Sequence, residues 1–229
     1  MPYNMSILKE IVKSSQVISD FTAFCYNILQ ANLILRKGVS CKGAFLNNTR
    51  IIISGKGNTI TLGRLSRLYN CKITIHGNNC KVVIGGGSTI IRNTEFCLED
   101  DNNYIFIGKD FTMEGGHIAS TEGERITIGN DCMFSSDVEI RNGDSHVIID
   151  VKTGKRTNWS SCITIGDHVW LAAHVRVLKG SSIPSHTVIG SSSIVSGKLS
   201  DENAVYAGIP AKLIKEKTDW DRFRNNYQK

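Results

Sequence analysis

A period of six residues is the feature of this sequence that most narrows what the chain can fold into. Written in sixes from residue 165, the chain reads IGDHVW, LAAHVR, VLKGSS, IPSHTV, IGSSSI and VSGKLS. This period matches neither the helical repeat of 3.6 residues nor the simple alternation of a strand. Repeats of this length are typical of a parallel β-helix, in which one aliphatic residue per side points into the bore. The aliphatic first positions are Ile165, Leu171, Val177, Ile183, Ile189 and Val195.

Upstream the same pattern continues in a looser form. The runs IIISGKGNTITLG, KITIHGNNCKVVIGG and NYIFIGKD place short β-branched stretches between Gly and Asn residues. Gly and Asn tolerate the left-handed backbone conformation that tight corners need. We therefore expect this half of the chain to form structural wall, continuous with the regular coils that follow.

The aliphatic column breaks at His146. Ile128, Phe134 and Ile140 lie six apart, so the next aliphatic residue is due at position 146, where the chain has histidine. The stretch after it, VIIDVKTGKRTNWSSC, is polar and basic, and it interrupts the repeat until Ile163. A long excursion from a regular solenoid is usually a functional loop.

The sequence divides into an N-terminal helical segment at 1–38, a solenoid at 39–212 with a loop insertion at 147–162, and a C-terminal helix or tail at 213–229. Apolar residues recur at helical spacing between 5 and 35, which predicts one or two amphipathic helices. We expect their apolar face to cap the open end of the solenoid, because terminal coils need a lid. A helix lying on a membrane surface is less favoured, since its polar face is not rich in Lys and Arg.

The charge balance and the cysteines limit the partners and the compartment. Lys and Arg number 27 against 21 Asp and Glu, and this mild excess favours anionic ligands or simply solubility. We expect no nucleic-acid binding, because no basic run is interleaved with aromatic residues. Seven scattered cysteines without a CxxC pair indicate a reducing compartment. With no signal-peptide pattern and no apolar span of about 20 residues, we expect a cytoplasmic protein, or one peripheral to the inner face of the membrane.

Three stretches carry a resemblance to a known family. IGDHVWLAAHVRVLKG, VIGSSSIVSGKL and AVYAGIPAKLIK together resemble the end of a hexapeptide-repeat acyltransferase, and more narrowly the O-acetyltransferases of bacterial capsular and other surface polysaccharides. The resemblance implies an all-β solenoid, a left-handed parallel β-helix, that assembles as a homotrimer with active sites between subunits. It also implies acetyl-CoA as the donor, no metal, and a sugar hydroxyl of capsule, O-antigen or a precursor as the acceptor.

His146 is the predicted general base. Acetyl transfer to a hydroxyl requires removal of the hydroxyl proton, and free imidazole, with a pKa near 6.5, suits that task. The motif RNGDSH resembles the catalytic histidine of the family, and the break in the column favours this role over that of a wall residue. The Asp144 carboxylate could orient the imidazole ring, and a backbone carbonyl could do the same.

Trp170 and the last coils are predicted to bind the donor. Trp170 resembles the tryptophan that lines the acetyl-donor site in the family, where an indole can wall a slot for the pantetheine arm. Otherwise it is a partly buried residue at a subunit contact. A backbone N–H near Ala172 or Ala173 is a candidate oxyanion donor. The candidate coenzyme contacts are Trp170, Ala172, Ala173, Lys179, Gly180, Ser191, Ser192, Lys198, Ala207, Gly208, Lys212 and Lys215, and the candidate acceptor contacts are Arg141, Asn142, Lys155 and Arg156.

Other functions stay open at this point. The same base would serve N-acetylation of an amino sugar, free or nucleotide-linked, and a catalytically silent β-helix could act as a scaffold. His168 and His174 lie six apart and, with His146, suggest a three-histidine zinc site. Their spacing and surroundings do not match the β-helical carbonic anhydrases, so we expect no metal. His117 borders a neighbouring subunit's cleft or is a surface residue.

Overall fold

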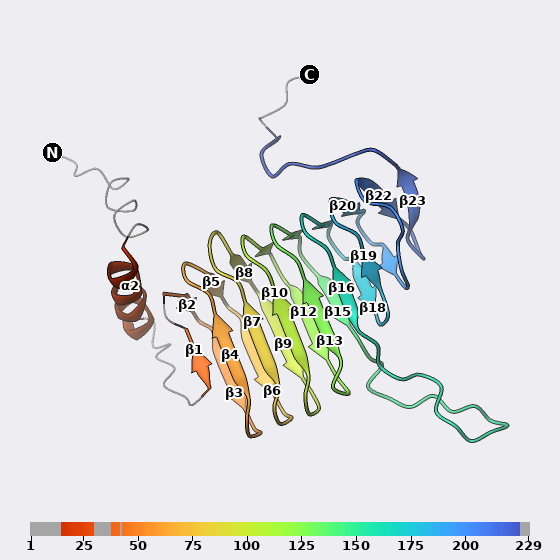
Figure 1. Cartoon of the computed structure of the whole chain (residues 1–229), viewed down its shortest axis with the longest axis horizontal. Helices are drawn as coiled ribbons and strands as arrows, with labels where there is room; N and C mark the ends of the chain where they lie inside the picture. Colours follow the sequence, from red (N-terminus) through yellow and green to blue (C-terminus); the bar gives the residue numbers. More distant parts are fainter. Residues whose placement is uncertain (1–14, 30–37, 42, 225–229) are drawn as a thin grey trace.

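The computed structural model describes residues 15–29, 38–41 and 43–224, which form one helix followed by a three-sided parallel β-solenoid (Figure 1). The chain passes in turn through three sheets, here named A, B and C. Each strand pairs in parallel with the equivalent strand of the next coil, except for the last strand of sheet B. The predicted all-β solenoid with a helix near the N-terminus is confirmed.

Sheets A and C contain seven strands each, and sheet B contains nine. Sheet A consists of β1 (Val39–Ser40), β4 (Thr59–Leu62), β7 (Lys81–Ile84), β10 (Tyr104–Ile107), β13 (Arg125–Ile128), β16 (Ile163–Ile165) and β19 (Ser182–Ile183). Sheet B consists of β2 (Phe45–Asn47), β5 (Arg67–Tyr69), β8 (Ile90–Arg92), β11 (Thr112–Met113), β14 (Met133–Phe134), β17 (Trp170–Leu171), β20 (Thr187–Ile189), β22 (Ala204–Ala207) and β23 (Lys212–Lys215). Sheet C consists of β3 (Arg50–Ile53), β6 (Lys72–Ile75), β9 (Thr94–Leu98), β12 (Gly116–Ser120), β15 (Val138–Arg141), β18 (Arg176–Leu178) and β21 (Ile194–Val195).

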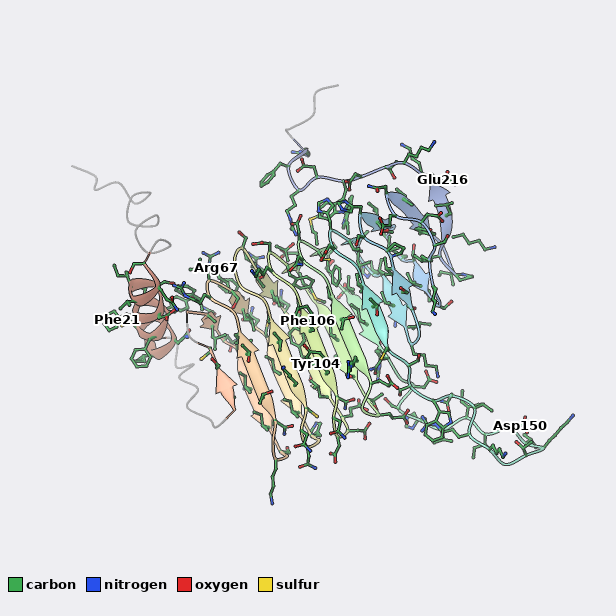
Figure 2. All side chains as sticks on the ribbon, in the orientation of Figure 1. Phe21, Arg67, Tyr104, Phe106, Asp150 and Glu216 are labelled. Carbon is green, nitrogen blue, oxygen red and sulfur yellow. The ribbon has the colours of Figure 1, made fainter. Side chains whose placement is uncertain are left out.

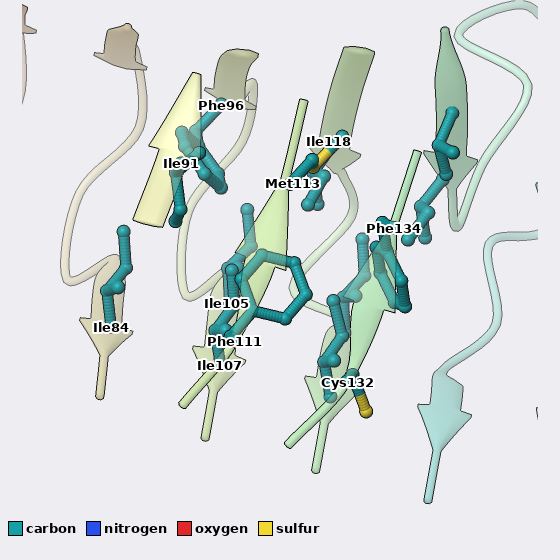
Figure 3. Packing of buried hydrophobic residues seen from close by; sticks show 14 of the residues in the cluster. Ile84, Ile91, Phe96, Ile105, Ile107, Phe111, Met113, Ile118, Cys132 and Phe134 are labelled. Atoms are coloured by element: carbon teal, nitrogen blue, oxygen red, sulfur yellow. The ribbon is translucent and has the colours of Figure 1, made fainter. Parts of the chain in front are cut away.

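The predicted aliphatic column lies inside the bore. Its six members, from Ile165 to Val195, are no more than 2% exposed, and Phe134 upstream is 1% exposed. Phe134 packs edge-to-face on Phe111, with ring centroids 4.9 Å apart (Figure 3). In the last coils, residues that pair between neighbouring coils lie three hexads apart in the sequence, as Thr164 and Ser182 do.

The looser phase upstream has a simple cause. There the register advances by more than three hexads per coil, from Thr59 to Lys81 and then to Tyr104. The extra residues lie in corners. At one corner Asn48, Asn70 and Asn93 all have positive φ. The amide of Asn48 donates to that of Asn70 at 3.0 Å, and Asn70 donates to Asn93 at 3.2 Å.

Three of the seven cysteines fill space in this core. All seven are free thiols, and Cys71, Cys80 and Cys132 belong to the buried cluster. Burial raises the pKa of Cys71 to about 11 and that of Cys132 to about 12. These two side chains therefore stay protonated and behave as small apolar groups.

Helix α2 (Gln16–Leu29) packs on the first coil with an unexpected face. Asn27 is buried, and its amide donates to the Ala44 carbonyl at 3.0 Å and accepts from the Leu46 N–H at 2.8 Å. Phe21 is 67% exposed, on the outer side of the helix (Figure 2). The prediction that the apolar face caps the solenoid is therefore wrong for α2, because an open strand edge needs hydrogen-bonding groups that apolar side chains lack. The rest of the predicted helical segment lies outside the described residues.

The predicted C-terminal helix does not form over residues 213–223, and residues 225–229 lie outside the described part of the chain. Instead β23 pairs antiparallel with β22, and residues 216–224 run back over earlier coils (Figure 1). The Arg222 guanidinium binds the Asp131 carboxylate, the Thr112 hydroxyl and two backbone carbonyls, which anchors this return path. No helix in the described part of the chain is both long and apolar enough to cross a membrane.

Candidate active site

The loop insertion predicted at 147–162 is an arm that projects from the solenoid between β15 and β16, with Asp150 at its outer end (Figure 2). The two ends of the arm meet, because the Ser161 N–H donates to the Asn142 carbonyl at 2.9 Å. Despite the insertion, β16 continues the wall in register, with Ile163 opposite Ile126. The arm is thus added to a corner without displacing any strand.

His146 lies where this arm begins, at the corner between sheets C and A. Its side chain is exposed, whereas the preceding member of the column, Ile140, is fully buried. The His146 carbonyl accepts a hydrogen bond from Asn158 Nδ2 at 2.7 Å. Its imidazole has no hydrogen-bond partner among the described residues, so both ring nitrogens are available to a substrate.

Asp144 is bound by other side chains than His146. Its carboxylate forms an ion pair with Lys179 and accepts from Asn158 Nδ2 at 2.8 Å. The hydrogen bond from Lys179 and then that from Asn158 lower the pKa of Asp144 below its usual range. The carboxylate is therefore held in its charged form, and orientation of the ring by Asp144 stays a prediction.

A pocket of about 470 Å³ opens at this corner. Asp144, which precedes His146 by two residues in the chain, is one of its lining residues. Both charges of the Asp144–Lys179 pair lie in its wall, together with the guanidinium-bearing Arg141. Such a pocket offers cations and a carboxylate to a polar ligand, and its backbone glycines leave room for one. Its lining residues are Arg141, Gly143, Asp144, Leu178, Lys179, Ser196 and Gly197.

The four acceptor candidates have different environments. Asn142 is fully buried, and its amide is used by Ser120 and Thr121, so it lies behind the site and not in it. Lys155 is exposed on the arm, where an acceptor can reach it. Arg156 forms an ion pair with Glu122, whose pKa it lowers to about 2.

The donor candidates other than Trp170 lie in three places. Those after β17, β20 and β22 stack at one corner, where the Ser192 N–H donates to the Ala173 carbonyl at 2.9 Å. The Ala172 N–H already donates to the Ile189 carbonyl at 3.0 Å, which leaves Ala173 as the oxyanion candidate of the pair. This corner holds Ala172, Ala173, Ser191, Ser192, Ala207 and Gly208. Strands of sheet C are followed by Lys179, Gly180 and Lys198, and β23 of sheet B carries Lys212 and Lys215.

Trp170 begins β17 in sheet B and is partly buried. Its ring lies 6.1 Å from the ring of Trp220, which the returning C-terminal segment supplies. Trp220 stacks on His168 at 4.2 Å, with the planes 11° apart, and its indole N–H donates to the His168 carbonyl at 2.8 Å. The C-terminal segment therefore borders Trp170, the residue predicted to bind the acetyl donor.

His168, His186 and Asp219 form the cluster that sequence reasoning missed. His168 and His186 occupy equivalent corners of consecutive coils, both with positive φ, so a one-coil spacing was the available signal. Although the ligand atoms of the three lie within 4.8 Å of one another, both ring nitrogens of His168 face acceptors. They lie 2.6 Å from an Asp131 oxygen and 2.9 Å from the Trp220 carbonyl. This arrangement suits an imidazolium ion and not a metal ligand.

The docking of residues 216–224 is expected to weaken as pH rises. Burial alone would lower the pKa of His168, but the Trp220 carbonyl and the Asp131 carboxylate outweigh it and raise that pKa. A raised pKa in the docked state means that the contribution of His168 is complete at low pH and is lost as pH rises through the raised value. His186, Asp219 and Arg222 also face this contact.

Hydrogen–deuterium exchange of residues 216–224, corrected for intrinsic chemistry, would measure this effect. His168→Gln should weaken the pH dependence. His174→Gln is the matched control, because His174 lies at a corner with positive φ, is well exposed and, among the described residues, pairs with Asp137 at 3.5 Å. Equal pH dependence in all three proteins would contradict the prediction.

Comparisons with known proteins identify relatives of this chain. No family model matches the chain. A polysialic acid O-acetyltransferase of Neisseria meningitidis is 34% identical over 189 residues, which is 73% of this chain and 87% of that protein. A putative lipopolysaccharide biosynthesis O-acetyl transferase of Escherichia coli K12, WbbJ, is 39% identical over 108 residues, 44% of this chain and 54% of that protein.

Two solved structures share the solenoid. That of the polysialic acid O-acetyltransferase OatWY superimposes with a TM-score of 0.71 at 30% identity and covers 81% of this chain and 92% of its own. That of the polysialic-acid-specific acetyltransferase NeuO gives a TM-score of 0.65 at 32% identity and covers 77% and 90%. These proteins share both sequence and fold with the chain over most of its length.

Proposed function

Because this chain belongs to the hexapeptide-repeat O-acetyltransferases of bacterial surface polysaccharides, we propose that it transfers acetyl from acetyl-CoA to a hydroxyl of an acidic glycan, with His146 as general base. The observation that carries the assignment of the base is the position of His146. The column of buried residues reaches the surface there, at the root of the arm and beside the pocket that Arg141, Asp144 and Lys179 line. An exposed imidazole without an internal partner is free to accept a substrate proton.

The proposed reaction has two stages. His146 takes the proton of the acceptor hydroxyl as that oxygen attacks the thioester carbonyl and forms a tetrahedral intermediate. The carbon–sulfur bond then breaks, and the imidazolium returns its proton to the leaving thiolate of coenzyme A. The N–H of Ala173 is the proposed donor to the oxyanion, and Trp170 is proposed to position the donor.

An acidic acceptor is supported by the charge around the site. The chain carries a net charge of +6, Lys155 projects from the arm, and Arg141 lines the pocket. Two of the relatives, OatWY and NeuO, act on polysialic acid, a polymer that bears one carboxylate per sugar. A panel of acidic and neutral bacterial polysaccharides incubated with acetyl-CoA, followed by location of the new ester by NMR, tests this proposal. Acetylation of neutral polymers alone would contradict it.

We also propose a left-handed solenoid that assembles as a trimer. His146 lies at the corner between sheets C and A, whereas Trp170 begins a strand of sheet B, so sheet A separates them within one chain. A site that uses both residues is supplied most simply by two copies. The exposed apolar residues of the arm, Val147, Ile148, Ile149, Val151 and Trp159, could then pack on a neighbour.

Sedimentation at micromolar concentration is expected to give a trimer. Ile148→Asp should shift the population towards monomer, because a charge would be buried against the neighbouring copy. Val17→Asp on α2 is the matched control, since Val17 is 78% exposed and far from the arm. A wild-type monomer with full turnover would rule out a shared site.

A further inference from the structure

Asn158 lies at the root of the arm with all its side-chain hydrogen bonds satisfied. It is 6% exposed. Its Nδ2 donates to Asp144 Oδ2 at 2.8 Å and to the His146 carbonyl at 2.7 Å. Its Oδ1 accepts from the Ile148 N–H at 2.7 Å and from Arg156 Nε at 3.3 Å. One buried amide thus connects the outgoing and returning halves of the arm to the predicted catalytic corner.

The chemistry of these partners requires an amide at this position. A carboxylate and a carbonyl can only accept, whereas a backbone N–H and a guanidinium can only donate. The side chain must therefore present two donors on one side and an acceptor on the other. Aspartate has the same shape but no donors, and it would place a second carboxylate against Asp144.

His146 is held through its backbone and not through its ring. Its carbonyl is bound by Asn158, and the same amide binds Asp144 before it and Ile148 after it in the chain. The path of the chain on both sides of the histidine is therefore fixed, while the imidazole stays free. We propose that Asn158 is a positioning residue that sets where the His146 ring stands relative to the acceptor hydroxyl.

Lys179 belongs to the same arrangement. Its ammonium pairs with Asp144 and donates to the Asn158 carbonyl at 3.2 Å. Lys179 directly follows β18, so it links both residues to the wall of the solenoid. We call Asn158, Asp144 and Lys179 the His146 clamp. The sequence placed Lys179 among the donor-binding residues, whereas membership of the clamp assigns it to the position of the base.

This inference rests on the proposed function, and Asn158→Asp tests it. The substitution removes both donors and keeps the acceptor, so the expected result is a fall in kcat of about 10²-fold, the cost of a misplacement near 1 Å. The KM for acetyl-CoA should not change, because the clamp does not touch the donor. Asn58→Asp is the matched control: Asn58 is 7% exposed and binds the Gly77 carbonyl and the Cys80 N–H, far from the arm. Its kcat should stay at the wild-type value.

Two further variants keep the proposal testable if Asn158→Asp lowers the melting temperature more than its control does. Lys179→Met should lower kcat and leave the KM for acetyl-CoA unchanged, whereas a phosphate-binding lysine would raise that KM. The double variant His146→Ala with Lys179→Met should be no slower than His146→Ala alone, because a positioning residue acts through the base.

The outcomes separate the two proposals. Full transfer by His146→Ala would overturn the proposed base. Loss of transfer in His146→Ala, with kcat retained in both folded clamp variants, would overturn the clamp and leave the base in place. A raised KM for acetyl-CoA in Lys179→Met would remove Lys179 from the clamp.

Discussion

Replacement of His146 by alanine is expected to lower kcat for acetyl transfer by about 10²–10⁴-fold, the usual range for a general base. Binding of acetyl-CoA should stay close to that of the wild type, because the imidazole is proposed to act on the proton of the acceptor. The side chain is exposed and forms no hydrogen bond through its ring with the described residues, so its removal should not destabilise the fold. Transfer under saturating donor and acceptor, together with donor titration by calorimetry, measures both quantities.

His76→Ala is the control for this experiment. His76 is also exposed and follows a strand of sheet C, β6, but lies several coils from the arm. Its kcat should match the wild type. Near-wild-type transfer by His146→Ala would show that the base lies elsewhere, and His117 and His174 would be the next candidates.

Replacement of Phe111 by alanine is expected to lower the free energy of unfolding by about 3–5 kcal/mol. Phe111 is fully buried, and its ring packs edge-to-face on Phe134 within the cluster shown in Figure 3. Each coil contributes few residues to the bore, so the cavity has little chance to collapse. The midpoint of urea unfolding at constant m-value reports the change.

Phe106→Ala is the matched control, because Phe106 is on β10 with its side chain on the outer, partly exposed face (Figure 2). Its expected cost is well below that of Phe111→Ala. Equal costs at the two positions would mean that the bore does not dominate the stability of the solenoid.

The sequence predicted the bore well because its signal is periodic. Every residue from Ile165 to Val195 in the aliphatic column is buried, and the break at His146 marks the start of the arm. The period carries this information because each coil repeats the environment of the one before. It could also have paired His168 with His186, which occupy the same corner one coil apart.

Contacts outside the repeat could not be predicted in this way. The side chain of Arg222 reaches Thr112, more than one hundred residues earlier, and nothing in the charged C-terminal stretch indicates that partner. Asn158 was likewise read only as part of a polar loop, because its role depends on where the arm folds back. The exposed face of α2 was assigned wrongly, since helical periodicity identifies an apolar face without saying what covers it.

The meeting of the two ends of the arm at Asn142 and Ser161 has a consequence for how this enzyme can diversify. A segment that leaves and re-enters the wall at one point can lengthen, shorten or change sequence while β13 and β16 keep their register. Natural variation in the arm then carries no matching penalty in foldability. Arms can accordingly be exchanged between relatives without redesign of the wall.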